Sequence, residues 1–187
     1  QGKILLAGPS DTVNLKKLIE KLEKNTDLIL IDGALSRKTF GSPSITDAMI
    51  LSTGASLSAS LNVVVKKTKF IYQMTQLPQY EGKHAEQLQQ IENGIYAITD
   101  EGIIDLKIPS LMMIDKYKDK IFDSGTKLFI AGALNDKFVQ FLKIQKNIQE
   151  IEIIIKDFTK VFSNEDNTLQ YLKKKGKIKV LDKANLI

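Results

Sequence analysis

The chain has 187 residues, of which 43% are hydrophobic, a formal net charge of +5 and no cysteine. This length and hydrophobic content predict a single domain over residues 1–187 with a continuous core. The lack of cysteine excludes disulfides, a thiol nucleophile and a thiolate metal site, and it is typical of a cytoplasmic protein. No apolar run reaches the ~20 residues needed to cross a bilayer, so we expect no membrane association.

The positive charge comes from lysines spread over the whole chain, a distribution typical of a solvated surface. One dense run stands near the C-terminus: Lys173, Lys174, Lys175, Lys177 and Lys179. We interpret it as the exposed end of a helix and an exposed strand, and a nucleic-acid contact is the less favoured alternative. A homo-oligomer remains open. Because the chain begins with Gln1 rather than methionine, a second open possibility is that the chain is the C-terminal part of a longer protein.

The first elements in chain order form a strand, loop and helix. Residues 3–7 are a continuous apolar run, and an amphipathic helix follows with Ser10 or Asp11 as its cap. Residues 28–31 are a second uninterrupted apolar run, typical of a strand buried on both faces of a parallel sheet. A polar loop comes next, and Ser44 with Asp47 three positions later predicts the start of another helix through residue 51. A further helix is expected over 61–74, and a short one over 86–91.

The second half of the chain alternates between strand and helix patterns. Residues 94–108 predict a hairpin that turns at 100–102, and 110–121 predict a helix. Buried strands are expected at 127–131, 151–155 and 178–181, with helices around Phe138 and over 169–173, where Gly176 is the expected terminator. We therefore predict an α/β fold: a mostly parallel open sheet with helices on both faces and a β-hairpin insertion at 94–108.

Ligands of open α/β sheets bind beyond the carboxyl ends of the strands, where loops and helix starts present backbone amides. The loop at 8–12 is one candidate, because Gly8 and Ser10 stand where an anion would meet the start of a helix. An ordinary tight turn is the alternative interpretation.

The loop from Asp32 to Asp47 is the stronger candidate. Asp32 at the end of an apolar run resembles the acid that P-loop nucleotide hydrolases place beside magnesium, so a magnesium ion with a nucleotide is the cofactor that this loop suggests. Further ligand-binding candidates are Gly33, Arg37, Lys38, Ser42, Ser44 and Asp47. Arginine and lysine pair with phosphate or carboxylate groups, and hydroxyls beside a helix start accept or donate hydrogen bonds. The alternative is that these residues only cap the loop and the helix.

Two absences limit the chemistry. The chain contains neither G-x-x-x-x-G-K-[ST] nor G-x-G-x-x-G, so a nucleotide phosphate loop would have to lie upstream or on a partner. His84 is the sole histidine, which excludes a multi-histidine metal site, and it stands in a polar stretch typical of a surface residue. We assign no catalytic residue, and whether the chain is an enzyme stays open.

Residues 28–57 carry a resemblance to a known family, through Asp-Gly-Ala-Leu-Ser-Arg-Lys at 32–38 and Ser-Pro-Ser-Ile-Thr-Asp at 42–47, together with Ala-Gly-Pro-Ser at 7–10. The segment resembles the smaller subunit of the reactivase of lysine 5,6-aminomutase, found in lysine-fermenting anaerobic bacteria. The resemblance implies assistance to an adenosylcobalamin and pyridoxal-phosphate enzyme, by exchange of damaged cobalamin with help from a partner ATPase. It transfers no catalytic residue.

The chain has no Asp-x-His-x-x-Gly motif, so direct cobalamin binding is disfavoured. Our first hypothesis is therefore an accessory protein that contacts the aminomutase, the ATPase or both through the loop 32–47. The second hypothesis is a P-loop-type nucleotide-binding or hydrolysing domain whose phosphate loop precedes residue 1. A basic nucleic-acid binder, based on the lysine run alone, is the third.

Overall fold

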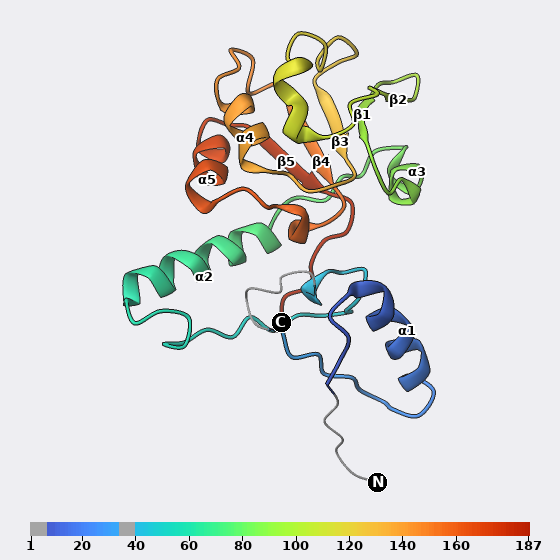
Figure 1. Cartoon of the computed structure of the whole chain (residues 1–187), viewed down its shortest axis with the longest axis vertical. Coiled ribbons are helices and arrows are strands. Elements are labelled where there is room, and N and C mark those ends of the chain that lie inside the picture. The colour runs from blue at the N-terminus through green and yellow to red at the C-terminus, as the bar shows by residue number, and fades with distance from the viewer. Residues whose placement is uncertain (1–6, 34–39) are drawn as a thin grey trace.

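The computed structural model describes residues 7–33 and 40–187. Helices α1 to α5 cover Thr12–Leu22, Leu61–Thr75, Ala85–Gln90, Asp136–Lys143 and Glu165–Lys173. Strands β1 to β5 cover Ile95–Ile98, Ile103–Asp105, Lys127–Ile130, Glu152–Ile155 and Lys177–Val180. The 3-10 helices η2 and η3 cover Leu111–Lys116 and Phe158–Lys160. Figure 1 shows a larger α/β body, with α2 along its underside and α1 in a smaller part below.

The body is built on one five-stranded sheet in the order β2-β1-β3-β4-β5. Strands β3, β4 and β5 are parallel, whereas β1 runs antiparallel to both β2 and β3. The predicted α/β fold is confirmed, but the predicted mostly parallel sheet is wrong, since the sheet is mixed. The hairpin is the reason: it extends the sheet beyond β3, because β1 pairs antiparallel with β3 and β2 pairs antiparallel with β1.

The strand expected at 28–31 does not contribute to this sheet. Residues 28–31 have no strand structure, and Leu28 and Leu30 are 74% and 81% exposed, so the prediction of a buried parallel strand there is wrong. Of the run 3–7, only Ala7 lies within the described residues, and it is exposed coil. A parallel strand is stable only when both of its faces are covered, and the body offers 28–31 no such cover.

The helix expected from Ser44 to residue 51 is also absent. Residues 43–45 form a turn, in which the backbone amides of Ile45 and Thr46 donate to the carbonyl of Ser42. Met49 then pairs with Leu186 in an isolated parallel bridge to the C-terminal tail. Asp47 is too short to complete a capping box with Ser44, and the tail supplies backbone partners that a helix here would not use.

Most of the remaining elements agree with the sequence pattern. Asp11 is the cap of α1 and accepts from the backbone amide of Asn14 at 2.8 Å. The hairpin turns through Thr99, whose amide donates to the carbonyl of Gly102 at 2.9 Å. Helices α2, α3, α4 and α5 and strands β3, β4 and β5 form where apolar periodicity and caps predicted them. The helix expected over 110–121 is replaced by η2 and turns.

Each face of the sheet carries its own apolar cluster. Alternate residues of the strands, such as Leu128 and Ile153, pack with buried residues of α2, α4, α5 and η2. The intervening residues Phe129 and Ile154 pack on the other face against Leu88 of α3. Helices therefore lie on both faces, and the central strands are enclosed between them.

The end of α5 shows a departure from the expected terminator. Lys175 adopts the left-handed conformation with φ 67°, and the amide of Gly176 donates to the carbonyl of Tyr171 in a Schellman arrangement. Gly176 is required for a different reason. A Cβ on Gly176 would lie 2.3 Å from the ring of Tyr171, which is fully buried.

Candidate functional site

The carboxyl end of β4 carries a buried acidic residue that sequence analysis missed. Asp157 follows the strand by two residues, is 3% exposed and caps η3. Its Oδ1 accepts hydrogen bonds from the backbone amide and the hydroxyl of Thr159. An apolar strand ending in Lys-Asp was the available signal, but nothing local in the sequence distinguishes Asp157 from an exposed strand end.

Ser42 brings the predicted loop to this carboxylate. The Ser42 hydroxyl donates to Oδ2 of Asp157 at 2.7 Å, across 115 positions of sequence, and both side chains are buried. Burying a carboxylate is costly unless donors satisfy its oxygens, and Ser42 and Thr159 supply those donors. The pair therefore fixes the segment after residue 40 to the end of β4.

Two predicted residues line the outer side of this anchor. The hydroxyl of Ser44 lies 3.0 Å from that of Ser42, and Ser44 itself is exposed. Asp47 is exposed as well, and its backbone carbonyl accepts from the side chain of Asn185 at 3.2 Å. Residues 40–47, which we call the anchored loop, thus combine a buried attachment with an exposed polar edge.

The start of the predicted site is arranged differently. Asp32 and Gly33 are exposed. The ring of Phe40 lies close to Gly33, since a Cβ added to Gly33 would be 3.2 Å from it. Asp32 does not end a buried strand, so the geometry on which its comparison with P-loop hydrolases rested is absent. Arg37 and Lys38 lie outside the described residues.

The described residues also bear on the metal prediction for Asp32. Over 7–33 and 40–187, the structure brings together no group of three or more histidine, cysteine or acidic side chains that could hold a metal ion. A carboxylate alone and in water holds Mg²⁺ only weakly, and such ions are usually bound with substrate phosphates. The role of Asp32 as a metal ligand therefore stays a prediction without a second ligand in view.

Gly8 and Ser10 are exposed at the start of α1, as their sequence position suggested. The N-terminus of this helix is already capped by Asp11, whose carboxylate accepts a hydrogen bond from a backbone amide of the first turn. Hydrogen bonds from the backbone and then the side chain of Asn14 hold the pKa of Asp11 below its usual value. A second anion at this helix start would be repelled by the ionised Asp11, which disfavours the anion interpretation of the loop 8–12.

His84 lies before α3, with its Nδ1 3.3 Å from Oε1 of Gln87. Its Nε2 is buried and has no hydrogen-bond partner within the residues that the structure describes. The expected fully solvated histidine is therefore a half-buried one. A histidine that acts as a general base needs a carboxylate to orient its ring, and none does so among the described residues.

The described part of the chain contains no helix that is long and apolar enough to cross a membrane. Comparison of the chain with family models, with curated proteins and with solved structures finds no match. The anchored loop at the end of β4 is therefore the candidate site that the geometry of the molecule itself supports.

Proposed function

We propose that this protein is an accessory protein, the smaller reactivation subunit for an adenosylcobalamin-dependent lysine 5,6-aminomutase. In this proposal the anchored loop contacts the aminomutase or the partner ATPase. The sequence resemblance of residues 28–57 suggests the system, and the anchor of Ser42 on Asp157 supports the role of the loop. A buried attachment with an exposed polar edge presents Ser44 and Asp47 in a fixed arrangement, which lowers the entropic cost of recognition.

The occupancy of the Asp157 carboxylate favours binding over catalysis at this place. Both of its oxygens already accept hydrogen bonds, one from Ser42 and the other from Thr159. A general base must reach the proton that it removes from a substrate, whereas Asp157 is buried and 3% exposed. A carboxylate satisfied by two residues of its own chain instead fixes the loop.

A reactivation assay tests the proposal. Lysine 5,6-aminomutase carrying a cobalamin without its adenosyl group is mixed with this chain, the partner ATPase, ATP with magnesium and adenosylcobalamin. Release of the damaged cobalamin is followed by absorbance, and the return of aminomutase activity by product formation. We expect both to require this chain, and a reaction that proceeds equally without it contradicts the proposal.

A charge reversal locates the contact on the anchored loop. Asp47→Lys changes an exposed side chain, so we expect the fold to persist and the reactivation rate to fall by about 10-fold or more, equivalent to ~1.4 kcal/mol. Asp119→Lys is the matched control, because Asp119 is also exposed but lies in the connection before β3. Equal rates for the two variants would place the contact elsewhere.

Thermal unfolding with added ligands separates this proposal from nucleotide binding by the chain itself. A ligand that binds only the native state raises its stability in proportion to the logarithm of its concentration. We expect no shift from ATP or GTP with magnesium, from adenosylcobalamin or from pyridoxal phosphate when the chain is alone. A shift with a nucleotide that Asp32→Ala removes would support the nucleotide-binding alternative instead.

A further inference from the structure

Helix α2 has two apolar faces, and only one of them is covered by the body. Phe70 and Met74 point into the core and are each 2% exposed. Leu61, Val65 and Tyr72 lie at spacings of four and seven residues, so they share another face, and they are 74%, 55% and 50% exposed. A helix that is apolar on opposite faces is normally buried on both, so the second face lacks its cover.

This second face forms one wall of an open groove of about 720 Å³. The other wall is formed by Leu51, residues 53–55 and residues 58–59. This segment is joined to α2 by a 2.8 Å hydrogen bond between the hydroxyls of Thr53 and Thr68. From Leu61 to Tyr72 the groove runs along about 16 Å of helix, three turns. Because its walls are so exposed, the groove is suited to a macromolecular segment rather than to an enclosed small molecule.

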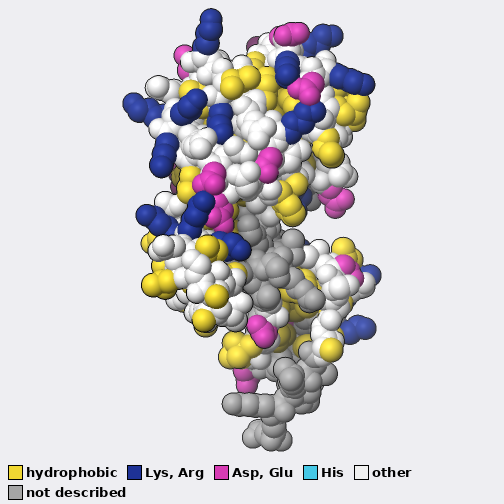
Figure 2. All heavy atoms as spheres, turned by 60° about the vertical axis from the view of Figure 1, so that its left-hand side comes forward, with side chains coloured by type: hydrophobic (Ala, Val, Ile, Leu, Met, Phe, Trp, Pro, Cys, Tyr) yellow, Lys and Arg dark blue, Asp and Glu magenta, His cyan; other side chains and the backbone are white. Residues whose placement is uncertain are grey.

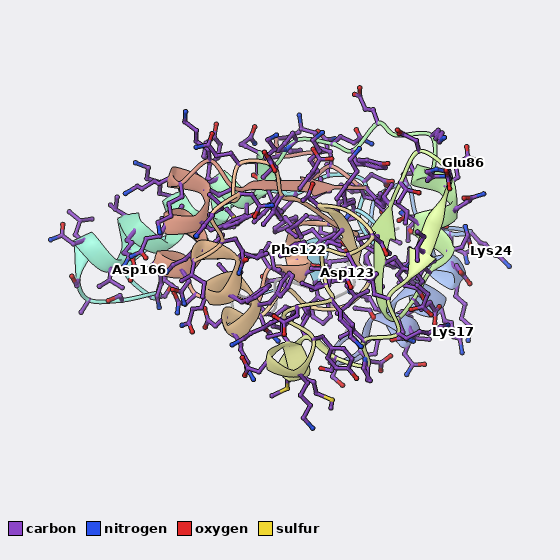
Figure 3. All side chains as sticks on the ribbon, turned by 90° about the horizontal axis from the view of Figure 1, so that it is seen from above. Lys17, Lys24, Glu86, Phe122, Asp123 and Asp166 are labelled. Carbon is purple, nitrogen blue, oxygen red and sulfur yellow. The ribbon has the colours of Figure 1, made fainter. Side chains whose placement is uncertain are left out.

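The lining of the groove carries a positive charge. Lys69 is the charged residue among those that line it, and α2 contains no acidic residue. Lys66, one turn before Lys69, forms an exposed ion pair with Asp166 of α5, which Figure 3 shows beside α2. Within the described parts of the chain Lys69 forms no ion pair. Figure 2 brings the side of the molecule with α2 forward and shows hydrophobic (yellow) and basic (dark blue) side chains next to one another there.

The positive charge of this helix selects among occupants. A second copy of the chain, packed through the same groove, would place two α2 helices side by side, each with lysines at 66, 67 and 69 and no acidic residue. Like charges across an interface disfavour that pairing. An acidic segment would instead neutralise Lys69 while its apolar side chains cover Leu61, Val65 and Tyr72.

We propose that the groove between α2 and residues 51–59 binds an amphipathic α-helix of a partner protein, with aliphatic side chains in the groove and acidic residues against Lys69. Helices recognised in this way place anchors at positions i, i+3 or i+4 and i+7, which matches the three exposed turns of α2. The groove shares no residue with the anchored loop, so this inference does not rest on the proposed function.

The test uses the whole chain and two synthetic peptides of about 18 residues, long enough to form a helix on binding. Both peptides carry leucine at positions 1, 5, 8 and 12 of the apolar face, and one has glutamate and the other lysine on the flanks. Binding is measured by fluorescence anisotropy of the labelled peptides. We expect the acidic peptide to bind, more weakly as salt is raised, and the basic peptide to bind at least ~10-fold more weakly.

Three variants of the chain connect the binding to the groove. Val65→Glu should weaken binding of the acidic peptide by about 10-fold or more, because it places a negative charge on the apolar wall. Met112→Glu is the control, because Met112 is 71% exposed in η2, away from the groove lining. Lys69→Glu should weaken binding of the acidic peptide and strengthen binding of the basic peptide, a reversal that a general loss of folding would not produce.

Four outcomes would overturn the inference. They are binding of neither peptide, equal binding of both peptides, an equal effect of Val65→Glu and Met112→Glu, and the absence of the reversal in Lys69→Glu. Sedimentation of the chain alone provides a further arm: a dimer that Val65→Glu dissociates would assign the groove to a second copy. Binding to phosphatidylserine vesicles that the same variant removes would assign it to an anionic membrane surface.

Discussion

Replacing Ser42 with alanine should release the anchored loop from the body. The change removes the donor to Oδ2 of Asp157 and leaves that oxygen buried. Hydrogen bonds to charged groups contribute ~1.5–3 kcal/mol, so we expect a loss of about 2 kcal/mol. Just after the loop, the C-terminal tail also holds Met49: the amide of Met49 donates to the carbonyl of Asn185, and the carbonyl of Met49 accepts from the amide of Ile187.

Hydrogen exchange followed by mass spectrometry measures this loss where it occurs. If the loop opens locally, about 2 kcal/mol corresponds to an exchange rate about 30-fold higher for the amides of residues 45–49 and 187. The amides of β3 and β4 should change much less. Ser44→Ala is the control, because Ser44 is exposed and its loss should cost less than ~0.5 kcal/mol.

A double-mutant cycle identifies the partner. Asp157→Ala and the double variant, compared with Ser42→Ala, should give a coupling energy of about 1–3 kcal/mol, since the two side chains are in direct contact. Two results would refute the reasoning: unchanged exchange at residues 45–49 in Ser42→Ala, and additive effects of the two substitutions. Either one would mean that the loop is held mainly by the backbone pairing with the C-terminal tail.

Further predictions concern the body. Gly176→Ala should destabilise the chain by about 1–3 kcal/mol in urea unfolding, because the new methyl group meets the buried ring of Tyr171. Leu142→Ala, at a fully buried position of α4, should cost about 2–5 kcal/mol, whereas Leu61→Ala on the exposed face of α2 should cost much less in the same measurement. Burial raises the pKa of Tyr171 above its usual 10.0, so the unfolded state loses its phenol proton first and stability should fall as pH rises above about 10. Tyr171→Phe should reduce that fall, and an unchanged alkaline profile would contradict the role of this phenol. Hydrogen bonds from Lys118 and Lys137 hold the pKa of Asp115 at about 2, so its carboxyl resonance should titrate below the usual range, and Lys137→Ala should raise the midpoint.

The sequence predicted the body well because local signals and burial agree there. Runs such as 128–130 and 153–155 are apolar, each is followed by a capped helix, and the resulting strands pair in register. Residues 28–31 carry an equally apolar run, yet Leu28 and Leu30 are exposed. A run of four apolar residues specifies a strand only when a neighbouring strand is available, and that information is not local.

The candidate site depended on long-range contacts in the same way. Ser42 and Ser44 were identified by their polar loop, but their arrangement is decided by Asp157, which is 115 positions from Ser42. The predicted helix after Ser44 fails for a related reason, since Met49 pairs with the C-terminal tail instead. Periodicity describes which face of an element is apolar, and it contains no term for a hydrogen bond between distant loops.

Residues 40–60 include both the anchored loop and one wall of the groove. This stretch has little regular secondary structure, but the body fixes it at Ser42, at Met49 and at Thr53 through side-chain or backbone hydrogen bonds. These attachments restrict the conformations of the stretch before any partner binds. A surface ordered in advance loses less conformational entropy on binding, so we expect the contacts proposed for the anchored loop and the groove to need only modest areas. Weakening an anchor should then reduce affinity through this entropy, even where the substituted residue touches no partner.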